Sequence, residues 1–179
     1  EKLKDGQIYD SNSFAISSAI KNSGSEVKMH KILSDKKEDV DKFYEDCSES
    51  DLIVTIGGVS KGDFDLIRDA ISKKGNIDFW GINMKPGKPL AFGQVNINQK
   101  KLFHIGLPGN PVSSYVCFEL FIRPILMKMQ GLKDVNRKKV LAKIDKDIVT
   151  NDGRRSYLRV NVIKDERDGY VAKVYDRQD

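Results

Sequence analysis

Residues 51–58 read DLIVTIGG, a nearly continuous β-branched run that stops at two glycines. Such a run is typical of a central strand that is buried on both faces of a sheet. The glycines open the loop GGVSKGDFD over residues 57–65, and a helix is predicted from about Phe64 to Lys74. In open α/β sheets, ligands bind beyond the carboxyl ends of the strands, where glycines let them approach the backbone. This stretch therefore predicts an α/β domain with a ligand site at the loop.

Short apolar runs and helical patterns alternate on both sides of this strand, as in an α/β layered domain. Ahead of it we expect a helix over residues 11–22 with Ser11 and Asn12 as N-caps, a strand over 27–33 and a helix over 36–48. After it we expect strands over residues 77–84, 90–95 and 101–105, then a helix that begins at Pro111 and is kinked or interrupted at Pro124. Gly131 marks the end of this domain.

Residues 133–179 follow a different pattern. Apolar and polar residues alternate with period two over residues 140–148, 156–163 and 170–175, which predicts a small antiparallel β-unit. These strands are too few to close a sheet, so we expect the parent protein to continue beyond Asp179. The chain is thus divided into an α/β domain over residues 1–132 and a partial β-domain over residues 133–179.

The composition is that of a soluble globular protein, with 39% hydrophobic residues and a net charge of +5. No basic stripe with interleaved aromatic residues is present, so nucleic-acid binding is not expected. The sequence has neither a run of roughly 20 apolar residues nor a secretory signal, so we expect no membrane contact and a cytoplasmic protein. Cys47 and Cys117 lack metal-ligand spacing and are predicted to be buried thiols, and His30 and His104 are interpreted as structural.

The turn MKPGKP, residues 84–89, brings two lysines together. Pro86 and Gly87 suit the central positions of a type II turn, which would hold Lys85 and Lys88 at its two ends. Two ammonium groups held in this way form an anion clamp. The alternative is a surface turn whose lysines point into water.

The junction GLPGNPVSS, residues 106–114, also joins a strand to a helix. Asn110 is predicted as its N-cap and Pro111 as its first helical residue. The N–H groups of Val112, Ser113 and Ser114 would then form an oxyanion site with the serine hydroxyls.

Two further sets of charges could act at such a site. Asp63 and Asp65 either cap the helix after the glycine loop or hold Mg²⁺ against a substrate phosphate. Strand alternation places Arg155 and Arg159 on one face and Arg154 on the other, and the pattern alone indicates solvated strand charges.

Four motifs together resemble the molybdopterin molybdenumtransferase family, the MoeA proteins and the gephyrin E domain. They are the DSN of residues 10–12, the glycine loop, the MKPGKP turn and the GLPGNPVS junction. The resemblance covers essentially the whole chain and implies a three-layer α/β/α molybdopterin-binding domain of the MogA-like kind. It also implies that residues 133–179 are the first part of the family's C-terminal β-subdomain.

The resemblance assigns roles to individual residues. It implies that Asp65, which closes the family's GGVSxGxxD pattern, binds Mg²⁺, whereas Asp63 occupies a variable position. Arg154, the first arginine of the family's R-x-x-[FY]-x-R pattern, would bind molybdate, and a last serine ligand would lie beyond Asp179. The catalytic residues would be Asp65, Lys85 and Lys88, and the other substrate-binding candidates are Gly57, Gly58, Ser60, Pro89, Pro108, Asn110, Pro111 and Ser113.

The implied reaction is attack of molybdate on adenylylated molybdopterin, with release of AMP, in a homodimer that acts on small molecules. Two alternatives remain. The adenylyltransferase of the same fold has a GGTG-type loop and lacks the MKPGKP turn, and a scaffold that binds protein partners has no need of clustered like charges.

Overall fold

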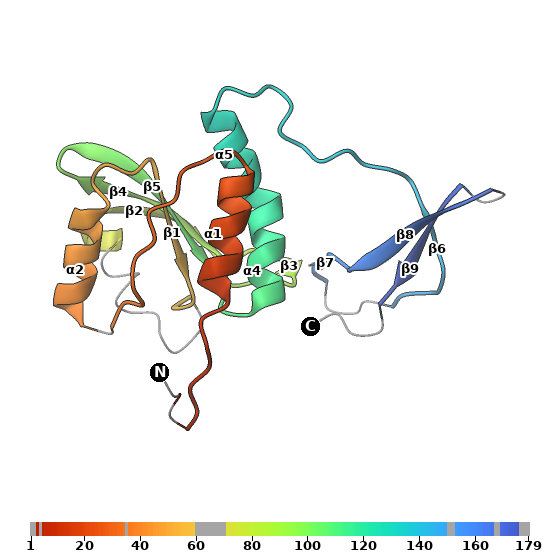
Figure 1. The fold of residues 1–179 in the computed structure, drawn as a ribbon, viewed down its shortest axis with the longest axis horizontal. Helices are drawn as coiled ribbons and strands as arrows, with labels where there is room; N and C mark the ends of the chain where they lie inside the picture. The colour runs from red at the N-terminus through yellow and green to blue at the C-terminus, as the bar shows by residue number, and fades with distance from the viewer. Residues whose placement is uncertain are drawn as a thin grey trace.

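The central sheet has four strands in the computed structural model, which describes residues 3, 5–34, 36–59, 71–149, 153–166 and 169–175 (Figure 1). Its strands are β1 (Leu52–Ile56), β5 (Lys100–Leu107), β4 (Ala91–Ile97) and β2 (Gly75–Trp80), and they lie in the order β1-β5-β4-β2. β1 runs parallel to β5, and the other two pairs are antiparallel. The prediction that β1 is a central strand is therefore wrong for the described residues, because β1 lies at one end of their sheet.

Helices cover both faces of this sheet, which confirms the three-layer α/β/α fold (Figure 1). One face carries α1 (Asn12–Asn22) and the helical segment α4 (Pro111–Cys117), η1 (Phe118–Ile122) and α5 (Arg123–Met129). The other face carries α2 (Lys37–Asp46). Because side chains alternate along a strand, neighbouring residues of β5 enter different cores: Ile105 packs under α4 and η1, and Leu102 packs under α2.

The start of α1 shows which of three adjacent polar residues caps it. The Asp10 Oδ1 accepts a hydrogen bond from the Ser13 N–H at 3.0 Å, whereas Ser11 has helical backbone angles and makes no side-chain cap. The prediction of Ser11 and Asn12 as caps is therefore wrong, and the cap lies one residue earlier. Gly24, with φ +82°, ends the helix as expected.

Residues 27–33 do not form the predicted strand. Their side chains bind α2 instead. The Lys28 ammonium donates to the Asp46 carbonyl at 2.9 Å, and the His30 ring packs edge-on against Phe43 with 5.1 Å between centroids. Period-two alternation shows that one side of a segment is buried, but it cannot show whether a neighbouring strand is available to pair with its backbone.

The helix from Pro111 is interrupted where the sequence predicts. Pro124 has no N–H group, and its ring would clash with the carbonyl one turn earlier. The chain widens into the five-residue π-helix η1 directly before the α5 helix that contains Pro124 in its first turn. Gly131, with φ +83°, follows shortly after the end of α5.

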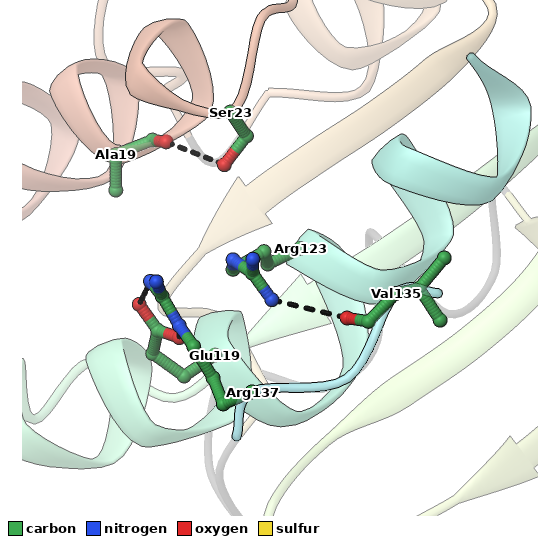
Figure 2. Close-up of polar contacts among 6 residues, drawn as sticks. All are labelled: Ala19, Ser23, Glu119, Arg123, Val135 and Arg137. Carbon is green, nitrogen blue, oxygen red and sulfur yellow. Dashed lines mark hydrogen bonds and ion pairs between the residues drawn. The ribbon is translucent and has the colours of Figure 1, made fainter. Parts of the chain in front are cut away.

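The segment that follows Gly131 is fastened back onto this helix (Figure 2). The Arg123 Nη1 donates to the Val135 carbonyl at 3.0 Å, and the Arg137 guanidinium binds both carboxylate oxygens of Glu119 at 2.9 and 3.0 Å. Arg137 is therefore the ion-pair partner of Glu119.

The C-terminal sheet contains β6 (Lys143–Ile144), β9 (Gly169–Val174) and β8 (Val160–Asp165), in that order. β8 and β9 form the expected antiparallel pair, but β6 runs parallel to β9, so the prediction of a purely antiparallel unit is wrong. β7 (Arg155–Ser156) leaves this sheet and pairs with β3 (Met84–Lys85) of the α/β part. The division after residue 132 stays a proposal, and the β3–β7 pair crosses it.

A polar chain lies inside the core between α2 and the sheet. His104 is fully buried, and its Nδ1 and Nε2 lie 3.1 Å from the Tyr44 hydroxyl and 3.0 Å from the Thr55 hydroxyl. Burial lowers the pKa of His104 to about 4, so its imidazole is neutral near pH 7. A neutral imidazole has one donor and one acceptor, and two hydroxyl groups satisfy both.

The two cysteines are buried and unpaired, as predicted. Burial raises the pKa of Cys47 to about 11 and that of Cys117 to about 12, so both are thiols rather than reactive thiolates. Among the described helices, none combines the length and the apolar character that crossing a membrane would require.

Candidate functional site

Two loops meet beyond the carboxyl ends of β1 and β5. Gly57 and Gly58 adopt φ values of +82° and +66°, a left-handed backbone that glycine enters without strain. The Gly57 N–H donates to the Leu107 carbonyl at 2.9 Å, and a Cβ added to Gly109 would lie 3.8 Å from the Gly57 Cα. The glycine loop and the GLPGNP junction therefore lie against each other, at the sheet edge where sequence reasoning expects the ligand.

The beginning of α1 joins these loops. The Asn12 side-chain amide donates to the Gly109 carbonyl at 2.7 Å, which holds the DSN motif against the junction. A cavity of about 1230 Å³ extends from this point along β1. Its walls include Asp10, Ser11, Asn12, Gly57, Gly58, Gly109 and Pro111 at one end, and residues 24–34 along its side. Three of the four predicted motifs thus border one cavity.

Asn110 caps α4, and Pro111 is in the first turn of that helix, as predicted. The Asn110 Oδ1 accepts from the Ser113 N–H at 2.9 Å, and the Asn110 carbonyl accepts from the Ser114 N–H at 2.9 Å. The Ser114 hydroxyl donates to the carbonyls of Pro108 and Asn110. Two of the three N–H donors predicted for the oxyanion site, those of Ser113 and Ser114, are therefore already bound within the cap.

The MKPGKP turn is closed by two backbone hydrogen bonds, from Ile82 N–H to the Lys88 carbonyl at 3.0 Å and from Gly81 N–H to the Leu90 carbonyl at 2.7 Å. The Lys85–Pro86 peptide bond is cis, and Gly87 has φ +102°, the positive value that the third position of a type II turn requires. The two lysines are held together as the clamp needs. Lys85 and Lys88 are both exposed on one closed turn, with half-buried Pro89 directly after it.

The turn is docked on α4 at Gly87. This residue has φ +102°, and a Cβ on it would lie 2.7 Å from the Cys117 Sγ and 3.2 Å from the Met84 side chain. The Cys117 thiol donates to the Gly87 carbonyl at 3.8 Å. Glycine is therefore required both by the backbone angle and by the close approach to α4. The two lysines rise from a turn whose base is part of the buried core.

The Arg154 segment is brought to this turn by the β3–β7 pair. The Arg155 N–H donates to the Asn83 carbonyl at 3.1 Å, and the Tyr157 N–H donates to the Lys85 carbonyl at 2.8 Å. Arg154, which is half-buried, directly precedes β7. The structure therefore places Arg154, about 70 positions after Lys85 in the sequence, directly before the strand that pairs with β3.

The structure does not describe the residue that is predicted to hold Mg²⁺. Ser60, Asp63 and Asp65 lie outside the described residues. Within the described part of the chain, no group of three or more His, Cys, Asp or Glu residues could hold a metal ion. Mg²⁺ needs only one or two protein carboxylates when substrate phosphates and water fill its other positions, so the residues present are compatible with the single carboxylate proposed below.

Sequence reasoning missed two residues that position the site. Asp10 could have been found, because it is the first of three adjacent residues that suit an N-cap. Asn83 could not, because its side-chain amide donates to the carbonyl of Gly153, 70 residues away, at 3.2 Å. No local pattern in the sequence predicts that contact.

Comparison with known proteins agrees with this arrangement. A family model described as "Probable molybdopterin binding domain" matches residues 1–128. The molybdopterin molybdenumtransferase of Haemophilus influenzae is 36% identical over 156 residues, which are 80% of this chain and 38% of that protein. Gephyrin of Dictyostelium discoideum is 37% identical over 153 residues, covering 73% of this chain and 21% of that protein.

A solved structure is similar over nearly the whole chain. It is that of the molybdopterin biosynthesis MoeA protein from Pyrococcus horikosii, with a TM-score of 0.76 and 32% sequence identity, covering 99% of this chain and 41% of that one. The chain spans less than half the length of these relatives. Since the family model matches well over half of the residues, the chain belongs to the family of molybdopterin binding domains.

Proposed function

We propose that this chain is the α/β core, with part of the following β-domain, of a molybdopterin molybdenumtransferase that acts in molybdenum cofactor biosynthesis. The family membership and the names of the relatives support the pathway. The observation that carries the specific activity is the β3–β7 pair, which joins the lysine turn to the Arg154 segment. A protein that only bound molybdopterin would not need three cations at one place.

The charges of the proposed substrates match these cations. Molybdate is a dianion, and the phosphoanhydride of adenylylated molybdopterin is also negatively charged. Lys85 and Lys88 are exposed on a turn that is fixed by Gly87, so they can meet an anion without first ordering a flexible loop. Arg154 adds a planar guanidinium that can bind two oxygens of one anion. Charge held in place in this way stabilises the charge that develops during phosphate transfer.

The proposed reaction is attack of a molybdate oxygen on the phosphoanhydride of adenylylated molybdopterin, which breaks the P–O–P bond and releases AMP. The dithiolene sulfurs replace oxygens of molybdate, which leave in the cleaved phosphate and as water, so that molybdenum stays on the dithiolene. In this scheme Lys85 and Lys88 contact the reacting phosphate and molybdate, and Arg154 and Pro89 contact molybdate. The substrate-binding surface would comprise Gly57, Gly58, Ser60, Pro108, Asn110, Pro111 and Ser113. Asp65 would hold Mg²⁺, which neutralises phosphate charge when bound.

The proposed protein works as a cytoplasmic homodimer on small-molecule substrates. The β-sheet of residues 143–174 leaves large apolar side chains exposed, among them Val162, Ile163 and Tyr170, which supports further packing against chain or partner outside this span. The similarity to gephyrin keeps a scaffold as a second candidate, since gephyrin is one of the named relatives.

The deciding experiment is to incubate the full-length protein with adenylylated molybdopterin, molybdate and Mg²⁺ and to measure AMP release. A molybdenumtransferase releases AMP only when molybdate is present. Formation of adenylylated molybdopterin from ATP and molybdopterin would instead identify the adenylyltransferase of the same fold. A scaffold would do neither, and the proposed activity would then be wrong.

A further inference from the structure

Asn83 grips the segment before β7 from two directions. Its side-chain amide donates to the Gly153 carbonyl at 3.2 Å, and its own carbonyl accepts from the Arg155 N–H at 3.1 Å. The residue between these two attachment points is Arg154. Both hydrogen bonds come from a single residue, two positions before Lys85.

The strand register shows how near this segment comes to the lysine turn. In the β3–β7 pair, Met84 lies beside Arg155 and Lys85 lies beside Ser156. The Tyr157 N–H also donates to the Lys85 carbonyl at 2.8 Å. Arg154 is half-buried and directly precedes β7, so the residue held by Asn83 leads into the strand that pairs with Lys85.

We propose that Asn83 is a positioning residue that holds Arg154 beside Lys85 so that both cations reach one tetrahedral oxyanion. This inference rests on the proposed function, in which that oxyanion is molybdate. Asn83 itself need not touch the ligand. It acts through Arg154, by fixing the backbone on both sides of the arginine.

Asn83 should affect how precisely Arg154 is placed more than it affects the stability of the fold. Asn83 and Gly153 are exposed, and an exposed hydrogen bond contributes little to global stability because water replaces it readily. Its effect on geometry is larger. An arginine side chain ordered in advance loses less freedom on binding, and a displacement of about 1 Å can cost on the order of a hundredfold in a reaction rate. Loss of the Asn83 amide should therefore weaken anion binding more than it weakens the fold.

The test is a double-mutant cycle on molybdate binding by the full chain, measured by calorimetry with molybdate alone as the probe. We expect Arg154→Ala to weaken binding at least about tenfold, as for a lost charge-assisted contact. Asn83→Ala should weaken binding about fivefold, and Asn83→Ala combined with Arg154→Ala should bind no more weakly than Arg154→Ala. AMP affinity should stay within about twofold in Asn83→Ala, since the glycine loop is untouched.

Asn76→Ala is the matched control. It also removes an exposed side-chain amide, which donates to the Asp78 carboxylate at 2.9 Å, but it lies on β2 at the other end of the sheet from β1. It should change neither affinity. If Arg154→Ala weakens molybdate binding and Asn83→Ala does not, the positioning role is wrong. It is also wrong if the effects of Asn83→Ala and Arg154→Ala simply add. If Arg154→Ala has no effect, the proposed function has lost its molybdate ligand, and this inference falls with it.

Discussion

The molecule has two polar clusters that differ in almost every physical property. The chain of Tyr44, His104 and Thr55 lies behind the sheet, is neutral, and satisfies its hydrogen bonds internally. In the second cluster, the charged Lys85 and Lys88 are exposed on the turn that Gly87 fixes, and half-buried Arg154 directly precedes the strand that pairs with β3. Burial removes charge because the charged form loses its hydration, whereas exposure lets like charges remain together. The first cluster should therefore govern stability, and the second should govern binding.

The largest expected effect is on the buried side. His104→Leu leaves the hydroxyl groups of Tyr44 and Thr55 without their shared partner inside the protein. Each unsatisfied buried group costs about 1–3 kcal/mol, so we expect a loss of about 4 kcal/mol in the free energy of unfolding. Urea denaturation followed by circular dichroism measures it. Lys101→Ala, an exposed change on the same strand, is the control and should have little effect. A loss below about 1 kcal/mol for His104→Leu would show that the buried cluster is not a stabilising element.

The second effect is the pH dependence that this buried histidine creates. The pKa of His104 is lowered from 6.5 to about 4 in the folded chain. Between these values the unfolded chain binds more protons than the folded one, so stability rises with pH. The contribution is complete above pH 6.5 and is lost as pH falls toward 4, by about 3 kcal/mol in total at 1.4 kcal/mol for each pH unit.

The measurement compares the wild type with His104→Gln, which keeps a donor and an acceptor but does not titrate. The difference in unfolding free energy between the two should change over the range from pH 6.5 to 4 and stay constant above it. The carboxylates titrate in both proteins, so their contribution to the unfolding free energy cancels in the difference. A difference that does not depend on pH would mean that His104 is protonated, or solvated, in the folded protein.

The sequence predicts a structural feature when that feature depends on residues close together in the chain. The existence of a strand in DLIVTIGG, the cap at Asn110 and the interruption at Pro124 were predicted correctly, because each depends on residues within about one turn or strand of each other. The place of that strand in the sheet was not. The strand over residues 27–33 was not, since strand formation depends on a free neighbour and those side chains bind α2. The prediction of a purely antiparallel unit was wrong because the partner and direction of β6 also depend on a distant strand, β9.

The candidate site divides in the same way. The residue types of the lysine turn were sufficient to predict that Lys85 and Lys88 lie on one closed turn, with Gly87 at positive φ. The N–H groups of Ser113 and Ser114 were assigned to a ligand, whereas the Asn110 cap uses them. The approach of Arg154 depends on a strand pair between distant segments, and only the resemblance to a known family indicated it from the sequence.

The third prediction tests the exposed side. Lys85→Ala and Lys88→Ala should each weaken AMP or molybdate binding by about 1.5–3 kcal/mol, the usual value of a charge-assisted hydrogen bond. Both side chains are exposed, so the free energy of unfolding should change little. Calorimetry at low salt measures the affinity, and raising the salt concentration should weaken wild-type binding through screening. Lys101→Ala is again the control. If both turn variants bind like the wild type, the turn is a surface loop and the charged cluster does not govern binding.

The smallest expected loss is in AMP release, and it concerns the carboxylate that would complete the charged cluster. Asp65→Asn should reduce metal-dependent AMP release at least tenfold, or about 1.4 kcal/mol, because an amide is a poorer ligand for Mg²⁺ than a carboxylate. Asp63→Asn serves as the matched control, since it makes the same chemical change two residues earlier and should have a smaller effect. AMP release is measured over a range of Mg²⁺ concentrations, where excess metal should partly restore Asp65→Asn by mass action. Equal losses in the two variants would show that the wrong carboxylate has been chosen. If neither variant responded to Mg²⁺, anion binding in this part of the molecule would rest on the lysines and Arg154 without a metal.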